Sequence, residues 1–521
     1  MKDTLKQRLL DFYGITEDDY QKLIAPCTIE TFADGHRFDR MEEAVNLVKD
    51  AVKNLKRIAI YGDYDADGIM GTSILVKMFQ YINYQVDYYI PSRYLDGYGL
   101  TLKYAQKAVD NGVGLLITVD NGVSAFEGIQ YLHEHGVAVL VLDHHTIQDQ
   151  LPVADVIIHP TFSHFGEITS SGAFTAFMFA SAFLGRVDKY LAMLASISLI
   201  SDMMPLLDYN RRLLKTCIND YQDGEFLPID LLKDGDQFNE NSIGMKIAPK
   251  INALGRMIET DEINKIVTFF TSDDKDMVLN YLNWINETNE LRKEASKEAT
   301  LGVKDIGADQ AAIAIVCDVK EGLLGLVANH LCNTYHVPVI AFAKEKEENV
   351  LKGSCRAPQG FNVVNAFNQL SDITLTAGGH ALAGGCSIKL EDFPLFKKRF
   401  EEIVRNTPLE KFEEKTIPLG LTEVTFENYD LINSFSPFGE NWPSPTFELK
   451  RIFTSSLTYS RNLEHILTYI GQGIKLVGFN FPKSEMPKYS YVDMTGRMKT
   501  SSYRGLLSLE FDIKSISESK K

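Results

Sequence analysis

The sequence predicts an α/β protein in three parts: a parallel-sheet domain, a second α/β domain joined to it by a long helix, and a small C-terminal β-barrel. Short apolar runs alternate with helix-favouring segments in two separate stretches of the chain, and short β-prone runs follow near the C-terminus. Strands that alternate with helices are typical of βαβ units and parallel sheets, whereas closely spaced short strands are typical of small barrels.

The chain is long enough for several domains. Its 521 residues exceed the roughly 250–300 residues at which a single hydrophobic core stops growing. With 45% hydrophobic, 24% charged and 11% aromatic residues, the composition is that of an ordinary globular protein. The six cysteines are widely spaced and form no CxxC pair, so we interpret them as buried or incidental thiols rather than zinc ligands or disulfide partners.

The N-terminus has none of the features of a secretory signal. Charges are scattered through it, and no apolar block precedes a small-residue cleavage site. The longest apolar stretch, near residues 173–184, is shorter than the ~20 residues that a bilayer-spanning helix needs. We therefore expect a cytoplasmic protein that makes no contact with membranes.

The first α/β domain is expected over residues 51–210, after an N-terminal helical segment at 1–50. Short, almost continuous apolar runs are typical of parallel strands that are buried on both faces. Five such runs predict strands at residues 57–61, 86–90, 114–119, 137–142 and 155–158. Apolar residues at helical spacing predict helices at residues 69–83, 101–111, 124–135 and 172–185.

The rest of the chain divides into three further regions. A helical region at 211–300 ends in a charged, helix-favouring stretch, which predicts a long exposed helix between domains. The second α/β domain is expected over 301–408, with the strands AAIAIV and VPVIAFA on either side of a helix near 323–335. The barrel is expected over 409–521, with β-prone runs FELKRIFTSS, GIKLVGFNF, YSYVDMTGRM and LLSLEFDIKS.

Acidic and histidine motifs follow three strands of the first domain. The first strand is followed by residues 62–68 (GDYDADG), the third by 120–122 (DNG) and the fourth by 143–145 (DHH). Ligand sites in open α/β sheets lie at the carboxyl ends of the strands, so the motifs are expected to converge on one crevice. Asp202, which follows the apolar helix LAMLASISLIS, is a further candidate for this crevice. Taken singly, each motif is also typical of a turn or a helix cap.

This many carboxylates in contact would raise one another's pKa and destabilise the fold, unless cations neutralise them. Oxygen ligands with one or two imidazoles suit Mn²⁺ or Mg²⁺, so we predict a centre with two metal ions. Two such ions a few Å apart can activate a water molecule and stabilise both oxygens of a displacement at phosphorus. Phosphodiester hydrolysis is the reaction that this arrangement favours.

Four motifs, DYDADG at 63–68, VDNG at 119–122, LDHH at 142–145 and SLISDMMPL at 198–206, resemble those of the DHH phosphoesterase family. The resemblance implies that the catalytic residues are Asp63, Asp65, Asp67, Asp120, His144, His145 and Asp202. The same residues without His145 are the implied metal ligands, and Asp120 is expected to bridge the two ions. Which acid of the first motif binds which ion stays open.

Further motifs are similar to those of the RecJ-type exonucleases within this family, and they extend the resemblance over roughly residues 50–515. The resemblance implies that the C-terminal barrel is an OB-fold that binds nucleic acid. They are PSRYLDGYGL at 91–100, KIAPKINALGRM at 246–257, GLLGLVANHL at 322–331, GSCRAPQGF at 353–361, GGHALAGG at 378–385 and SPFGENWPSPTF at 436–447. The implied substrate-binding residues are Arg93, Tyr98, Lys250, Asn252, Arg256, Ser354, Arg356, Gly378, Gly379 and His380. A salt bridge, a structural turn or ordinary packing is the alternative role for each of them. Cys355, Ala357 and Lys250 depart from the Gly, Ser and Arg usual in this group.

The resemblance implies a single-stranded-DNA-specific 5′→3′ exonuclease that acts in DNA repair and recombination, with single-stranded DNA as substrate and a single-strand-binding protein or a helicase as partner. The net charge of −17 argues against loose binding along a duplex, but it is compatible with a narrow basic channel. One alternative is a nanoRNA or cyclic-dinucleotide phosphodiesterase, whose members typically lack the barrel. Another is a non-catalytic replication scaffold, for which eroded metal motifs would be expected.

Overall fold

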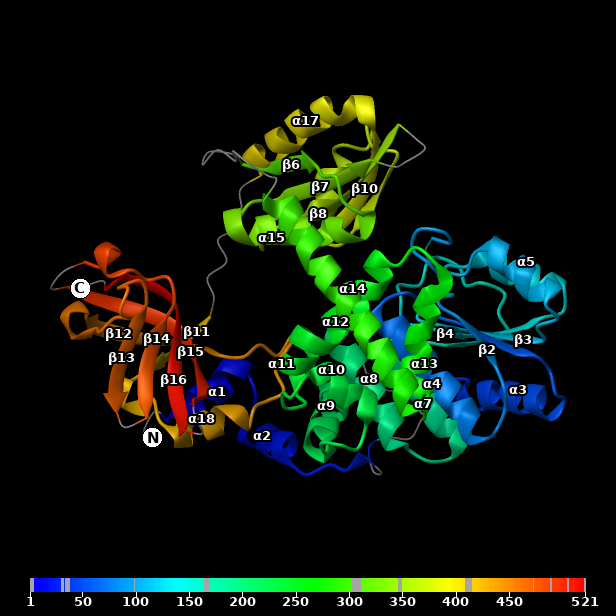
Figure 1. The fold of residues 1–521 in the computed structure, drawn as a ribbon, viewed down its shortest axis with the longest axis horizontal. Coiled ribbons are helices and arrows are strands. Elements are labelled where there is room, and N and C mark those ends of the chain that lie inside the picture. Colours follow the sequence, from blue (N-terminus) through cyan, green and yellow to red (C-terminus); the bar gives the residue numbers. More distant parts are fainter. Residues whose placement is uncertain are drawn as a thin grey trace. The chain divides into compact units, whose positions relative to one another are not determined.

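The computed structural model describes residues 4–29, 32, 38–97, 99–163, 169–301, 311–344, 349–407, 415–471, 473–487, 490–503 and 506–519 (Figure 1). The chain forms two compact units. The first contains Met1–Thr28, Pro205–Leu207 and Glu413–Lys521, and the second contains Ile29–Met204 and Asp208–Phe412. None of the helices in these described ranges is both long and apolar enough to cross a bilayer.

A parallel five-stranded sheet forms the centre of the first α/β domain, in the order β2-β1-β3-β4-β5. Its strands are β1 (Ile58–Tyr61), β2 (Asp87–Tyr89), β3 (Leu115–Val119), β4 (Ala138–Leu142) and β5 (Val156–Ile158). Every residue of β1 and β3 is buried, as expected for strands covered on both faces. All five lie within the predicted runs, so the predicted parallel sheet is confirmed.

Helices cover this sheet on both faces (Figure 1). They are α3 (Met41–Lys53), α4 (Ala66–Tyr81), α5 (Leu102–Asp110), α6 (Phe126–Glu134), α7 (Gly172–Leu184) and α8 (Lys189–Ser201). Helix α4 is apolar and buried along most of its length, as is typical of a helix inside a core. It begins at Ala66, three residues before the predicted helix, so the acidic motif at 63–68 forms its cap and first turn.

The helical region leads into a long helix that continues to the second α/β domain. Its helices are α9 (Asp208–Asp220), α10 (Leu227–Lys233), α11 (Glu240–Ser242), α12 (Ala248–Met257), α13 (Lys265–Thr271) and α14 (Lys275–Leu301). A π-helical turn at Ile243–Ile247 precedes α12. With 27 residues, α14 confirms the predicted long charged helix (Figure 1).

The second α/β domain has a mixed sheet in the order β6-β7-β8-β10-β9, in which only the pairing of β6 with β7 is parallel. Its elements are β6 (Ile313–Val316), α15 (Leu324–Tyr335), β7 (Val339–Lys344), β8 (Val350–Arg356), α16 (Val363–Asn368), β9 (Thr376–Gly379), β10 (Ala383–Lys389) and α17 (Phe393–Asn406). Phe342, Phe396 and Phe400 pack ring against ring in its core.

The other compact unit has a six-stranded sheet in the order β11-β12-β15-β16-β14-β13. Its strands are β11 (Thr416–Leu419), β12 (Thr446–Phe453), β13 (Ile466–Gly471), β14 (Ile474–Gly478), β15 (Tyr491–Tyr503) and β16 (Leu506–Glu518). The unit also contains α1 (Leu5–Tyr13), α2 (Glu17–Ile24) and α18 (Phe426–Asn433).

The predicted N-terminal segment at 1–50 is divided between the two units. Tyr13 stacks on Trp442 with the ring centroids 4.2 Å apart, and Tyr20 packs against Phe435 at 4.9 Å, so α1 and α2 belong to the unit with the six-stranded sheet. Helix α3 belongs to the other unit. The remaining domain boundaries stay a prediction.

Candidate metal centre

The first acidic motif is shaped by the turn between β1 and α4. Asp65 is the N-cap of α4, and its Oδ1 accepts hydrogen bonds from the amides of Asp67 at 3.0 Å and Gly68 at 3.1 Å. A Cβ atom at Gly68 would lie 2.5 Å from the backbone nitrogen of Asp63. The close turn therefore requires glycine, and it holds the three carboxylates of the motif at the carboxyl end of β1.

The carboxylate of Asp67 is fixed by the first turn of α7. Its two oxygens accept from the amides of Gly172 and Ala173, each at 2.7 Å, where the helix dipole favours negative charge. A Cβ atom at Gly172 would lie 2.8 Å from the Cα of Asp120. Glycine at this position thus lets the start of α7, the first motif and Asp120 meet.

Asp120 lies at the centre of the cluster, with only 2% of its surface exposed. Its backbone has a φ of 62°, in the left-handed region that Asp adopts more readily than most residues. Next to it, Asn121 Nδ2 donates to the carbonyl groups of Gly62 at 3.1 Å and Val119 at 3.0 Å, which fixes this turn against the first motif. Burial, and then the negative charge of Asp67, raise the pKa of Asp120 well above its usual value of 3.8.

His144 faces three carboxylates through one nitrogen. Its Nε2 lies 3.0 Å from Asp120 Oδ1, 3.5 Å from Asp202 Oδ2 and 3.6 Å from Asp67 Oδ2. Burial, and then the charge of His145, lower the pKa of His144 to about 3. The imidazole is therefore neutral near pH 7, which is the state that can donate a lone pair to a metal ion.

His145 is paired with Asp143, which begins the motif at 143–145 but is not among the predicted catalytic residues or metal ligands. His145 Nδ1 lies 2.8 Å from Asp143 Oδ1. Burial opposes protonation, but the hydrogen bond and the charge of Asp143 raise the pKa of His145 to about 9. Asp143 also accepts from the amides of Val123, His144 and His145. The only sequence signal for this role was its place next to the histidines.

All seven predicted catalytic residues come together at this edge of the sheet. Their ligand atoms form three groups, within each of which all atoms lie within 4.8 Å of one another. The groups are Asp63 with Asp65 and Asp120, Asp67 with His144 and Asp202, and Asp120 with His144 and His145. Asp120 belongs to two groups, so its position suits an acid that lies between two cations.

Burial and mutual repulsion disfavour the charged form of several acids in the cluster. Burial, and then the charge of Asp65, raise the pKa of Asp63 to about 8 and that of Asp67 to about 6. Burial, and then Asp67, raise the pKa of Asp202 to about 8. A buried set of carboxylate oxygens with a neutral imidazole has the donor chemistry that fits Mn²⁺ or Mg²⁺.

Predicted substrate-binding arginines form a second, cationic group. Burial, and then the positive charges of Arg93, Arg292 and Arg356, lower the pKa of Arg256 to about 10. The guanidinium carbon of Arg93 lies over the ring of Tyr64, 4.4 Å from its centroid. In the sequence of the first motif, Tyr64 stands between Asp63 and Asp65. The arginine group therefore adjoins the acidic cluster.

Arg356 and Ser354 lie together on β8. The Nη1 of Arg356 donates to Ser354 Oγ at 3.1 Å, and a Cβ atom at Gly325, near the start of α15, would lie 2.9 Å from Arg356 Nη2. Cys355, between them on the strand, is buried in the core of the second α/β domain. The side chain of Cys355, which stands where a glycine is usual, thus points away from the side chains of Ser354 and Arg356.

Asn252 and Lys250, two other predicted substrate-binding residues, make hydrogen bonds to backbone groups. Asn252 Oδ1 accepts from the amide of Ala66 at 2.9 Å, so this side chain fixes the start of α4. Lys250 donates to the carbonyl of Leu232 at 2.9 Å, beside α10. Substrate contacts for both stay a prediction, and Tyr98 lies outside the described residues.

Gly378, Gly379 and His380 lie on the exposed hairpin of β9 and β10. Gly379 has a φ of 142°, and a Cβ atom there would lie 2.4 Å from the Cα of Gly384. Glycine at 379 thus allows the close approach of the two strands, whereas a Cβ atom at Gly378 would meet nothing within 4 Å. No contact joins the hairpin to the acidic cluster among the described residues, and its predicted role at phosphate is not tested by the geometry.

Three protein-family models match the chain in succession. The model for the DHH family, N-terminal domain, matches residues 57–200, the DHHA1 domain model matches residues 309–406, and the RecJ OB domain model matches residues 417–515. The acidic cluster falls within the first match, apart from Asp202, which lies two residues beyond it.

Similar proteins cover most of the chain. The single-stranded-DNA-specific exonuclease RecJ of Haemophilus influenzae is 29% identical over 532 residues, which are 93% of this chain and 91% of that protein. The RecJ of Bacillus subtilis is 32% identical over 430 residues, but this chain spans only 54% of its length.

A solved structure shows the same fold over almost the whole chain. The crystal structure of RecJ from Thermus thermophilus in complex with Mn²⁺ matches with a TM-score of 0.86 at 23% identity, covering 99% of this chain and 76% of that one. This likeness shows the fold, and the three domain matches with the similar H. influenzae protein confirm the resemblance that the motifs indicated. The chain belongs to the DHH family, in the RecJ-type arrangement of DHH, DHHA1 and RecJ OB domains.

Proposed function

We propose that this protein is a single-stranded-DNA-specific exonuclease that hydrolyses phosphodiester bonds from the 5′ end with two divalent cations, Mn²⁺ or Mg²⁺. One observation carries the proposal: ligand atoms from four separate segments of the chain converge around Asp120 at the carboxyl edge of a parallel sheet. The similar proteins from B. subtilis and H. influenzae are named as exonucleases with this specificity.

Asp63, Asp65 and Asp120 would hold one cation, and Asp67, His144 and Asp202 would hold the other, with Asp120 between them. When bound, two divalent cations neutralise the carboxylates and polarise the phosphate as Lewis acids. The protein supplies a fixed geometry for them, because Asp65, Asp67 and Asp143 are each held by backbone amides.

His145 is suited to act on the phosphate directly. In the metal-free protein its pKa is raised to about 9, chiefly by the hydrogen bond between its Nδ1 and Asp143 Oδ1, which opposes the effect of burial. With 40% of its side chain exposed, His145 can serve as a donor to a bound phosphate or a leaving oxygen. Arg256, Arg356 and Ser354 would hold a second phosphate, toward the 5′ end.

A dinucleotide phosphodiesterase is the main alternative. The six-stranded unit, matched by the RecJ OB domain model, favours a long single strand, because such barrels bind several nucleotides along a backbone groove. The complete acidic cluster argues against a non-catalytic scaffold. A role in DNA repair and recombination, a single-strand-binding protein or helicase as partner and a cytoplasmic location are part of the proposal.

Digestion of end-labelled nucleic acids tests this function. With Mn²⁺ present, 5′-labelled single-stranded DNA should release labelled mononucleotide from the first turnovers, whereas a 3′ label should stay on long products. Duplex DNA and RNA of the same sequence should be degraded much more slowly, and EDTA should abolish the reaction. Faster cleavage of a dinucleotide than of the long strand, or release of the 3′ label first, would overturn the proposal.

The raised carboxyl pKa values predict that the metal-free protein loses stability as pH rises. Folded Asp67 releases its proton near pH 6 and folded Asp63 and Asp202 near pH 8, whereas an unfolded Asp does so near 3.8. These three acids make the folded state bind more protons than the unfolded state between about pH 4 and 8, so its free energy of unfolding falls across this window. His144, with its pKa lowered to about 3, has the opposite effect below about pH 6.5, but it is one group against three. Thermal unfolding in EDTA should show a Tm that decreases from pH 5 to pH 8.

Mn²⁺ should raise the Tm more at pH 8 than at pH 5, since cations replace protons on the carboxylates. An Asp63→Asn variant should show a weaker pH dependence in EDTA. A Tm in EDTA that rises from pH 5 to pH 8, or an equal effect of Mn²⁺ at both values, would be inconsistent with a cluster of protonated, metal-binding carboxyls.

Asp143→Asn should lower the apparent affinity for Mn²⁺ by about 10- to 100-fold, the range expected when a residue that orients a ligand is removed. The substitution removes the charge opposite His145 and places an NH₂ group among its backbone donors. Titration calorimetry with Mn²⁺ measures the effect. Asp155→Asn is a matched control, because Asp155 also accepts a backbone hydrogen bond, from Val139 at 2.8 Å, but lies outside the cluster. Equal affinity in both variants would refute the assigned role.

A further inference from the structure

Arg292, on the long helix α14, lies in the same cationic group as Arg93, Arg256 and Arg356, although nothing in the spacing of its charged segment distinguished it from its neighbours. We propose that Arg292 is a further phosphate-binding residue, which contacts the 5′-terminal part of a single DNA strand together with Arg256 and Arg356. This inference rests on the proposed function and extends its binding site to the helix that joins the two α/β domains.

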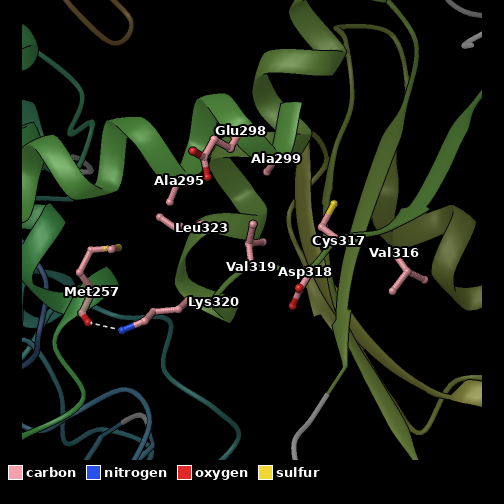
Figure 2. Close-up of a pocket in the computed structure, with 10 residues that line it drawn as sticks. All are labelled: Met257, Ala295, Glu298, Ala299, Val316, Cys317, Asp318, Val319, Lys320 and Leu323. Atoms are coloured by element: carbon pink, nitrogen blue, oxygen red, sulfur yellow. Dashed lines mark hydrogen bonds between the residues drawn. The ribbon is translucent and has the colours of Figure 1, made fainter. Parts of the chain in front are cut away.

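The face of α14 that carries Arg292 is turned toward the second α/β domain. Ala295 and Ala299 line a cavity of about 500 Å³ opposite Val319 and Leu323, as Figure 2 shows. Arg292 precedes these alanines by three and seven residues, and residues at this spacing share one face of a helix. Arg292 therefore lies on the face of α14 that is turned toward the segment at 316–323.

That segment is tied to the end of α12, where Arg256 lies. Lys320 Nζ donates to the carbonyl of Met257 at 2.8 Å, the bond drawn in Figure 2, and Arg256 Nη1 donates to the carbonyl of Gly322 at 2.8 Å. A Cβ atom at Gly322 would lie 2.9 Å from the Cα of Arg256. The segment therefore holds Arg256 close to the same face of α14, in agreement with the electrostatic effect of Arg292 on Arg256.

The guanidinium group of Arg292 has unused donors. Its Nη2 donates to Asn289 Oδ1 at 3.0 Å, whereas its Nε is buried and has no hydrogen-bond partner among the described residues. The Nε of Arg93 is likewise buried without a partner in the described part of the chain. Buried donors in folded proteins are almost always satisfied, so these two guanidinium nitrogens are available to a ligand that accepts hydrogen bonds.

The charge of the group points to an anion. Within the described ranges, none of the four arginines forms an ion pair with a carboxylate, and Glu290, two residues before Arg292, pairs with Lys293 at 2.7 Å. Four cations from a loop, two helices and a strand repel one another unless an anion lies between them. Phosphate groups of a DNA strand meet both requirements, since they are anionic and accept several hydrogen bonds from guanidinium groups.

The test compares binding of two oligonucleotides without turnover. Fluorescence anisotropy in EDTA measures the affinity of a single-stranded DNA with a 5′-phosphate and of the same strand with a 5′-hydroxyl. The wild-type protein should prefer the 5′-phosphorylated strand, and Arg292→Gln should weaken its binding on the order of 10- to 100-fold, the loss expected for a charge-assisted hydrogen bond. Arg292→Lys keeps the charge but not the planar set of guanidinium donors, so its affinity should lie between those of the wild type and Arg292→Gln. Lys293→Gln, one position away on the exposed side, should bind like the wild type.

Unchanged affinity and unchanged 5′-phosphate preference in a folded Arg292→Gln variant would overturn the inference, as would a wild-type protein that binds both strands equally. If Arg292→Gln does not fold, wild-type binding by Arg292→Lys would overturn it instead. Because no cleavage is involved, the result is separate from the proposed activity: a protein that binds as expected but does not degrade DNA in Mn²⁺ would refute the function and leave the phosphate site standing.

Discussion

Asp120→Asn should reduce exonuclease activity in Mn²⁺ by about 10³-fold or more, equivalent to about 4 kcal/mol of transition-state stabilisation. Asp120 Oδ1 lies 3.0 Å from His144 Nε2, and the carboxylate belongs to two of the three ligand groups. Asn has the same shape but lacks the charge, and it offers a single oxygen to a cation. Both cation positions should therefore be weakened at once. Single-turnover degradation of 5′-labelled single-stranded DNA measures the loss.

The same substitution should leave the Tm in EDTA unchanged or raise it. Asp120 is buried among like charges, so removal of its charge relieves repulsion in the metal-free protein. Loss of activity without loss of stability distinguishes a functional acid from a structural one. Asp155→Asn, outside the cluster, should keep full activity. An Asp120→Asn variant with wild-type activity would refute the proposed metal centre.

Gly255→Ala should lower both stability and activity, although Gly255 is not a candidate ligand. A Cβ atom at this position would lie 2.2 Å from the carbonyl oxygen of Tyr64, which stands between Asp63 and Asp65. This backbone cannot move aside without displacing the acids next to it. Overpacking of this kind typically costs about 1–3 kcal/mol, and a displacement of 1 Å at a reactive centre can reduce the rate by about 100-fold.

Denaturant unfolding and the end-label assay measure the two effects of Gly255→Ala. Gly244→Ala is the matched control, because a Cβ atom there would meet only Ile200 Cγ2, at an ordinary 3.5 Å. Ala is a better helix former than Gly, so this control should be as stable as the wild type or slightly more stable. Equal behaviour of the two variants would show that α12 does not hold the first motif in place.

The strands and most helices of the α/β domains follow from local sequence. Buried parallel strands appear in the sequence as short apolar runs, and all five strands of the first sheet lie within the predicted runs. The predicted start of α4 was three residues too late, because the residues that cap a helix are also the residues typical of turns. The division of the N-terminal segment depends on Tyr13 and Trp442, more than 400 residues apart in the chain, and no local pattern contains such a contact.

The acidic cluster was predictable because its residues follow strand ends and therefore meet at one edge. The residues that hold this cluster in place could not be predicted. Asp143 and Asn121 act through hydrogen bonds to backbone groups, and one sequence gives no sign of such bonds. Arg292 stands in a charged helical stretch where each basic residue is typical of a solvated surface. Only the packing of α14 against the segment at 316–323 distinguishes it.

Anomalous diffraction from crystals grown with Mn²⁺ tests the central claim most directly. Two peaks should appear roughly 3.5–4 Å apart, the usual separation in two-metal hydrolytic sites, one near Asp63 and Asp65, the other near His144 and Asp202, and both within ligand distance of Asp120. The absence of any peak at this edge of the sheet, or strong peaks only at other sites, would contradict the account.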